Sequence, residues 1–267
     1  MATVDAGSGK SENWGQGFRE LDRILRGEST RLSELRRGEV PVDSWMLTRV
    51  IVVLAMLHGV CMGTFAVLSS KGPGLSQVVA SMVKVPLLFY LTLLVTLPSL
   101  YVFNALVGSR LTFASMFRLL SATLGVNVAV LASMGPIVAF FSVCTTSYPF
   151  MVLFNVAVFA ASGFLALAFL LQTLQRLNLA QSLEQTPELG SPEESVGAIE
   201  ATSDQLLAKH VRTIFRLWVV LFGLVGAQMA WVLRPFIGNP DVPFTWFRAR
   251  QSNFFEAVLH AFQALFS

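Results

Sequence analysis

KVPLLFYLTLLVTLPSLYVFNALVGSR, residues 84–110, is a long apolar run with a cation at each end. Apolar runs of about 20 residues are typical of transmembrane helices, because a helix of that length crosses the hydrocarbon core of a bilayer. Pro86 falls in the first turn of the expected helix, where its missing N–H costs nothing. Pro98 lies mid-span and predicts a kink. The stretch therefore predicts a membrane span.

The composition extends this prediction to the whole chain. Of the 267 residues, 54% are hydrophobic and only 13% are charged, whereas soluble domains carry about 25% charged residues. The apolar runs predict spans at about 46–69, 85–108, 119–142, 150–174 and 214–233. We therefore expect an all-α fold, a polytopic bundle of about five transmembrane helices in the lipid bilayer.

The spans divide the chain into three regions. These are an N-terminal region (1–45), a membrane domain (46–238) with a flexible loop (175–211), and a C-terminal tail (239–267). The loop is acidic and rich in Pro, Gly and Ser, a composition typical of flexible segments.

Amphipathic patterns flank the membrane domain. In residues 14–37 apolar side chains recur at three- and four-residue steps between charges, which predicts one amphipathic helix or two short ones separated at Gly27. This segment either lies solvated on the membrane surface or docks a cytoplasmic partner. Residues 251–266 predict a second amphipathic helix, in the plane of the outer interface.

The positions of the cations predict the topology. With the N-terminus inside, the inside segments hold most of the Lys and Arg residues, as cytoplasmic loops do. We therefore expect a cytoplasmic N-terminus and a C-terminus outside. No Asn-X-Ser/Thr sequence occurs and the loops are short and Arg-rich, which favours a bacterial inner membrane.

Small, polar or helix-breaking residues inside the spans suit helix packing. They are His58, Gly59, Gly63, Pro98, Asn104, Asn127, Pro136, Asn155 and Gln228. Gly59 and Gly63 form a GxxxG pair, which permits close helix approach, and the asparagines are expected to face other helices. His58 is an ionisable residue at mid-span. It either bonds to a neighbouring helix or has a proton or ligand role.

Sequence motifs that carry chemistry are absent. The chain has no GxSxG, HExxH, Walker or GxGxxG motif, and no Asp or Glu lies in any predicted span. The three His are far apart, the Cys spacing fits no metal site, and the net charge of +3 is too scattered for nucleic acid. We predict no catalytic, cofactor-binding or metal-binding residue, no cofactor and no enzymatic activity.

Interaction and transport are the remaining functions. The polar faces of the spans and the two flanking helices favour a structural or interaction subunit, an assembly or scaffold protein, whose partners are other membrane subunits or copies of itself. The alternative is a homo-oligomeric channel or small-solute transporter that uses the proline-kinked second and third spans.

The span layout and the block PLLFYLTLLVTLPSLYVFNALVGS, residues 86–109, resemble the Yip1-type membrane domain. The resemblance covers roughly residues 46–238 and rests mostly on topology. It implies a cytoplasmic N-terminal region, five clustered spans and an outside C-terminus. Eukaryotic members of that family act in vesicle trafficking through small GTPases and form complexes with one another, so the resemblance also implies assembly with membrane proteins.

Overall fold

The computed structural model describes residues 8–28, 44–69, 74–106, 113–184, 217–234, 236–249 and 252–266. Throughout these ranges the regular structure is helical and no strand is present, which confirms the expected all-α class. The helices are α1 (Ser8–Leu25), α3 (Ser44–Leu68), α4 (Leu75–Leu106), α5 (Phe113–Cys144), α6 (Tyr148–Glu184), a helix at Leu217–Leu233, and α8 (Phe254–Phe266).

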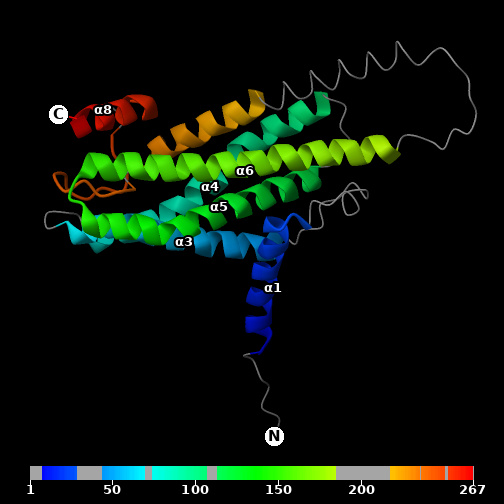
Figure 1. Ribbon diagram of the computed structural model, residues 1–267, viewed down its shortest axis with the longest axis horizontal. Helices are drawn as coiled ribbons and strands as arrows, with labels where there is room; N and C mark the ends of the chain where they lie inside the picture. Colours follow the sequence, from blue (N-terminus) through cyan, green and yellow to red (C-terminus); the bar gives the residue numbers. More distant parts are fainter. Residues whose placement is uncertain are drawn as a thin grey trace, which may run out of the picture.

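Four of the described helices are long and apolar enough to cross a membrane. The candidate spans are Trp45–Leu68, Leu75–Val102, Phe113–Cys144 and Tyr148–Arg176. α3, α4, α5 and α6 run side by side along the long axis of the molecule (Figure 1). α3 packs against both α4 and α5, and α5 packs in turn against α6. This is the architecture of a helical membrane bundle.

The helix Leu217–Leu233 is the described part of the predicted fifth span and is shorter than the other four. It runs antiparallel to α4. Near its start the Trp218 Nε1 donates a hydrogen bond of 3.0 Å to the Ser99 hydroxyl. Further along, a Cβ on Gly226 would lie 3.7 Å from the Thr92 methyl group. The helix therefore packs antiparallel against α4 between these two contacts, and a fifth crossing stays a prediction.

Gly59 and Gly63 allow α3 and α4 to meet backbone to backbone. A Cβ on Gly59 would lie 2.6 Å from the Ser81 carbonyl oxygen and 2.9 Å from the Met82 Cα. A Cβ on Gly63 would lie 2.8 Å from the Val78 Cα. Because these neighbours belong to the backbone, a side chain at either position would force the helices apart. Such contacts are what a GxxxG pair permits.

The start of α4 differs from the sequence prediction. The helix begins at Leu75, ten residues before the expected span 85–108, so Pro86 lies inside the helix and not in its first turn. Lys84, expected at the end of the span, is buried within it. The helix extends this far because its polar side chains find carbonyl acceptors in a distant segment, described below.

α5 and α6 are also longer than the expected spans, whereas α3 and α4 end at Leu68 and Leu106, slightly before the expected ends at 69 and 108. α5 begins at Phe113, earlier than the expected span 119–142. α6 continues to Glu184, so the first ten residues of the predicted flexible loop 175–211 are helical. These ten residues are mostly Gln, Leu, Ala, Arg and Glu, which are strong helix formers. The rest of that loop lies outside the described residues.

α1 lies across the bundle where α3 begins (Figure 1). Leu21 and Ile24 are buried on its inner face, and a Cβ on Gly17 would lie 2.7 Å from a Val50 methyl group. Gly27 follows the helix with a φ of 71°, a conformation that ends helices and favours glycine. The expected break at Gly27 is therefore present, and the segment beyond Glu28 lies outside the described residues.

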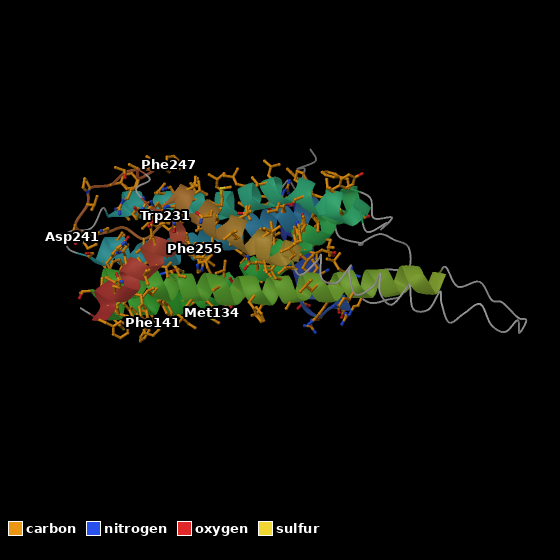
Figure 2. All side chains as sticks on the ribbon, turned by 90° about the horizontal axis from the view of Figure 1, so that it is seen from above. Met134, Phe141, Trp231, Asp241, Phe247 and Phe255 are labelled. Carbon is orange, nitrogen blue, oxygen red and sulfur yellow. The ribbon has the colours of Figure 1, made fainter. Side chains whose placement is uncertain are left out.

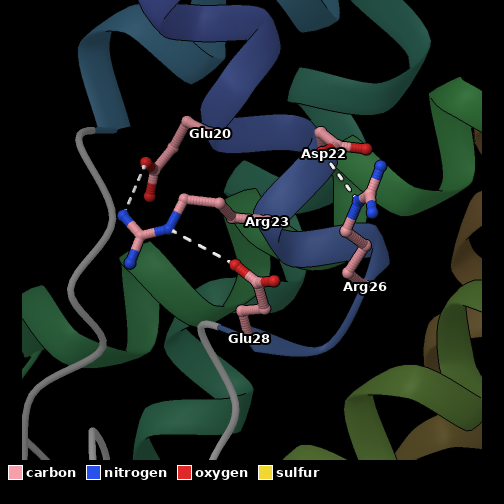
Figure 3. Close-up of polar contacts among 5 residues, drawn as sticks. All are labelled: Glu20, Asp22, Arg23, Arg26 and Glu28. Carbon is pink, nitrogen blue, oxygen red and sulfur yellow. Dashed lines mark hydrogen bonds and ion pairs between the residues drawn. The ribbon is translucent and has the colours of Figure 1, made fainter.

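The outward face of α1 is charged, and its acidic and basic side chains form ion pairs with one another. Arg23 lies 3.6 Å from Glu20 and 4.0 Å from Glu28, and Arg26 lies 2.8 Å from Asp22 (Figure 3). Exposed ion pairs of this kind contribute little to stability, because water and salt screen them. The apolar face therefore attaches α1 to the bundle.

The variant Ile24→Ala is expected to loosen α1 from the bundle. Ile24 is 1% exposed, and truncating a buried isoleucine to alanine costs about 2–5 kcal/mol. Limited trypsin digestion in mild detergent will measure the change as faster cleavage after Arg23. Leu25→Ala is the matched control, because Leu25 is 50% exposed. Equal cleavage rates for the two variants would contradict this attachment.

Residues 236–249 and α8 cover the end of the bundle opposite α1, which we call the α8 end. Trp231, Asp241, Phe247 and Phe255 all lie there (Figure 2). α8 packs against α6, yet none of its side chains is fully buried. Its orientation in the plane of an outer membrane interface stays a prediction.

Candidate functional site

A cavity of about 900 Å³ lies between α4, α5, α6, the helix Leu217–Leu233 and α8. This volume falls within the range of about 300–1,000 Å³ that is typical of ligand pockets. Apolar side chains dominate its wall, among them Leu88, Phe89, Leu124, Val152, Phe159 and Phe222. The cavity is therefore the candidate functional site.

Two arginines line the cavity at the α8 end. Arg234 directly follows the helix Leu217–Leu233, and its Cζ lies 3.6 Å from the centre of the Trp231 ring. Its Nη2 donates a hydrogen bond of 2.7 Å to the Ala249 carbonyl. Arg248 lies in residues 236–249, and its charge acts on the hydroxyl of Tyr148, the first residue of α6.

The charge of these arginines has no acidic partner in the described protein. The Nε atoms of Arg234 and Arg248 are buried without a hydrogen bond. No Asp or Glu is among the described lining residues, and within the described ranges all salt bridges lie in residues 20–28. Burial, followed by the charge of Arg248, lowers the pKa of Arg234 from its ordinary value. This end of the cavity therefore favours an anion.

Three donors on one face of α4 hold the segment that carries Arg248. Gln77 Nε2 donates to the Phe236 carbonyl at 2.8 Å, and the Ser81 hydroxyl donates to the same oxygen. Lys84 Nζ donates to the Trp246 carbonyl. Sequence reasoning missed this polar stripe. Its signal is the spacing of four and three residues, which places three polar side chains on one face of an apolar helix.

His58 is fully buried where α3, α5 and α6 meet. Its ring makes an edge contact with Phe159 at 5.5 Å between centroids, and a Cβ on Gly135 would lie 3.8 Å from its Nδ1. The Leu131 carbonyl faces the ring, yet neither ring nitrogen makes a hydrogen bond of normal geometry. His58 is not among the lining residues of the cavity, and a proton or ligand role for it stays a prediction.

The structure brings two of the three predicted asparagines to the cavity. Asn127 of α5 and Asn155 of α6 both line it. Asn155 Nδ2 donates a hydrogen bond of 2.9 Å to the Met151 carbonyl, while the Oδ1 atoms of both asparagines are buried without a partner. The side chain of Asn104 lies outside the described residues, and Gln228 is half-buried.

The two mid-span prolines lie away from the cavity. Pro98 and Pro136 are exposed, and neither lines the cavity. α4 and α5 each remain one helix across their proline. Beside Pro98, the Ser99 hydroxyl donates to the Thr96 carbonyl at 2.7 Å, whereas the carbonyl that Pro98 leaves without its helical N–H donor is that of Leu94.

No metal centre of three or more His, Cys, Asp or Glu residues occurs within the described residues. Comparison of the chain with known protein families, curated proteins and solved structures found no match. The resemblance to the Yip1-type domain therefore stays a prediction.

Proposed function

We propose that this protein is a non-enzymatic structural or interaction subunit of a membrane complex, with other membrane proteins or copies of itself as partners. The observation that carries the proposal is the exposed face of α6. Only 28% of the most apolar stretch of α6 is buried, against 50% for α3 and α4. Much of α6 is therefore available to another helix.

The exposed face of α6 carries small residues one turn apart. Ala157 and Ala161 are exposed, and Leu165 follows on the same face with 50% exposure. Acyl chains are as apolar as the helix surface, so the hydrophobic effect does not drive helices together in lipid. Helices associate there through the close packing that small residues allow. None of these three residues lines the cavity, so the face is distinct from the candidate site.

The proposal includes a location and an orientation. The excess of cations in the expected inside segments supports five crossings, a cytoplasmic N-terminus and a C-terminus outside, and the short loops favour a bacterial inner membrane. Because Leu21 and Ile24 are occupied by the bundle, a cytoplasmic partner of residues 14–37 would meet the charged face of α1. Electrostatic complementarity would then select an oppositely patterned surface.

The variant Ala161→Leu is expected to reduce recovery of a stoichiometric partner about tenfold. Added bulk at a close helix contact costs about 1–3 kcal/mol, and 1.4 kcal/mol is a factor of ten. Affinity purification in mild detergent followed by quantitative mass spectrometry will measure the recovery. Ala114→Leu, at an exposed alanine near the start of α5, is the matched control. Purification of the wild type as a lone monomer would contradict the proposal.

A small-solute transporter or homo-oligomeric channel is the second candidate. The observation in its favour is the cavity, with the unpaired oxygens of Asn127 and Asn155 in its wall. Because Pro98 and Pro136 are exposed, they do not contribute to that wall. A symmetric oligomer with a water-filled central pore in the purification above would favour this candidate.

A further inference from the structure

The body of the cavity suits hydrocarbon. Its wall is predominantly apolar, with Phe159 and Leu167 from α6 and Phe222 from the helix Leu217–Leu233. The cavity reaches the exposed surface at Phe164, which is 73% exposed, and at Gly223. An acyl chain that occupies the cavity can therefore enter sideways between these two helices.

The cavity is at least as long as one leaflet of a bilayer is thick. Along the helix Leu217–Leu233 the lining runs from Phe222 to Arg234, a distance of about 18 Å at the rise of an α-helix. One leaflet accounts for half of a hydrocarbon core of about 30 Å. Along α6 the lining runs from Tyr148 to Leu167, about 28 Å. The arginines thus lie at one end of an apolar cavity that is at least one leaflet deep, as a headgroup lies at one end of its acyl chains.

The charges at the α8 end select a phosphate. Two guanidinium groups, Arg234 and Arg248, lie close enough for each charge to act on the other, and each has a buried Nε without a partner. Guanidinium groups bind phosphate oxygens in bidentate fashion. Lys84 adds a third positive charge, which acts on Arg248, although its Nζ is bonded to the Trp246 carbonyl.

We infer that the cavity holds an anionic phospholipid, with its acyl chains between α6 and the helix Leu217–Leu233 and its phosphate at Arg234 and Arg248. A free phosphate would leave the apolar wall without a partner. A zwitterionic lipid would bring its own cation to a cationic site. This assignment goes beyond the proposed interaction role and does not depend on it, because the exposed alanines of α6 lie outside the cavity.

Native mass spectrometry of the full chain tests the inference. The protein is delipidated in mild detergent and titrated separately with dioleoyl phosphatidylglycerol, dioleoyl phosphatidylcholine or oleate. The wild type is expected to bind one phosphatidylglycerol at least about tenfold more tightly than phosphatidylcholine. The double variant Arg234→Gln, Arg248→Gln is expected to lose that preference. Each lost charged hydrogen bond lowers the affinity for phosphatidylglycerol about tenfold or more. Arg49→Gln, an exposed cation at the start of α3, is the control and keeps the preference.

A second variant keeps the test decisive if the arginine variant fails to fold. Nothing lies within 4 Å of a Cβ on Gly223, and this residue lines the cavity. Gly223→Phe is therefore expected to fold and to reduce binding of both lipids by filling the cavity. Equal binding of the two lipids by the wild type, tighter binding of oleate than of phosphatidylglycerol, or an unchanged preference in the arginine variant would overturn the inference. Partner recovery with Ala161→Leu tests a different surface, so either proposal can be contradicted without the other.

Discussion

The variant Gly59→Leu is expected to lose most of its folded population. A Cβ at this position would lie 2.6 Å from the Ser81 carbonyl oxygen and 2.9 Å from the Met82 Cα. Overpacking a core costs about 1–3 kcal/mol when side chains can adjust, and here only backbone could move, so the loss lies at or above the top of that range. Thermal unfolding in detergent, followed by circular dichroism, will measure it as a large fall in Tm.

Gly163→Leu is the matched control, because nothing lies within 4 Å of a Cβ on Gly163. Glycine inside a helix costs about 0.5–1 kcal/mol relative to alanine, so the control is expected to be neutral or stabilising. The milder pair Gly59→Ala and Gly163→Ala should show the same contrast with opposite signs. An identical Tm for that pair would show that α3 and α4 do not meet at Gly59.

The all-α class was predictable because the membrane restricts the choice of fold. Long apolar runs with few charges have to satisfy their backbone groups internally, and a helix does this within one segment. The GxxxG spacing likewise places Gly59 and Gly63 on one helix face. It does not indicate which neighbour that face meets, because α4 and α5 both pack against α3. Only the folded chain assigns the contact to α4.

The extent of α4 was not predictable, because its polar residues depend on distant acceptors. Lys84 marks the end of an apolar run in the sequence, where cations are common. Its acceptor at Trp246 lies 162 residues away in the chain. A lysine inside a membrane helix is costly unless it finds a partner, and nothing near Lys84 in the sequence supplies one.

The cavity was also not predictable from the sequence, for a different reason. An unfilled volume arises where helices fail to pack, and residues such as Gly163 and Gly223 have the same appearance in the sequence as glycines at a close contact. In the sequence, Arg234 and Arg248 are two of the cations that indicate only topology. Their meeting at Tyr148 depends on the return of residues 236–249 across the α8 end. Among the residues that the structure describes, the absence of acidic side chains around them is a property of the fold.

The triple variant Gln77→Leu, Ser81→Ala and Lys84→Met is expected to release residues 236–249 from α4. These side chains are the donors to the carbonyls of Phe236 and Trp246. Each of these part-buried hydrogen bonds contributes about 0.5–1.5 kcal/mol, so the loss of all three raises the open population of this segment about tenfold or more. Hydrogen–deuterium exchange of residues 236–249 will measure the release.

The bundle itself is expected to stay folded in the triple variant, because apolar replacements of similar shape avoid the cost of burying polar groups and leave the contact at Gly59 intact. Thr123→Val is the control, since the Thr123 hydroxyl bonds to the Leu119 carbonyl of its own helix at 2.9 Å and holds no other segment. Unchanged exchange in residues 236–249 would contradict the role of the three donors. Fast exchange there, with slow exchange retained in α3, would show that a polar stripe on α4 positions Arg248 at the cavity.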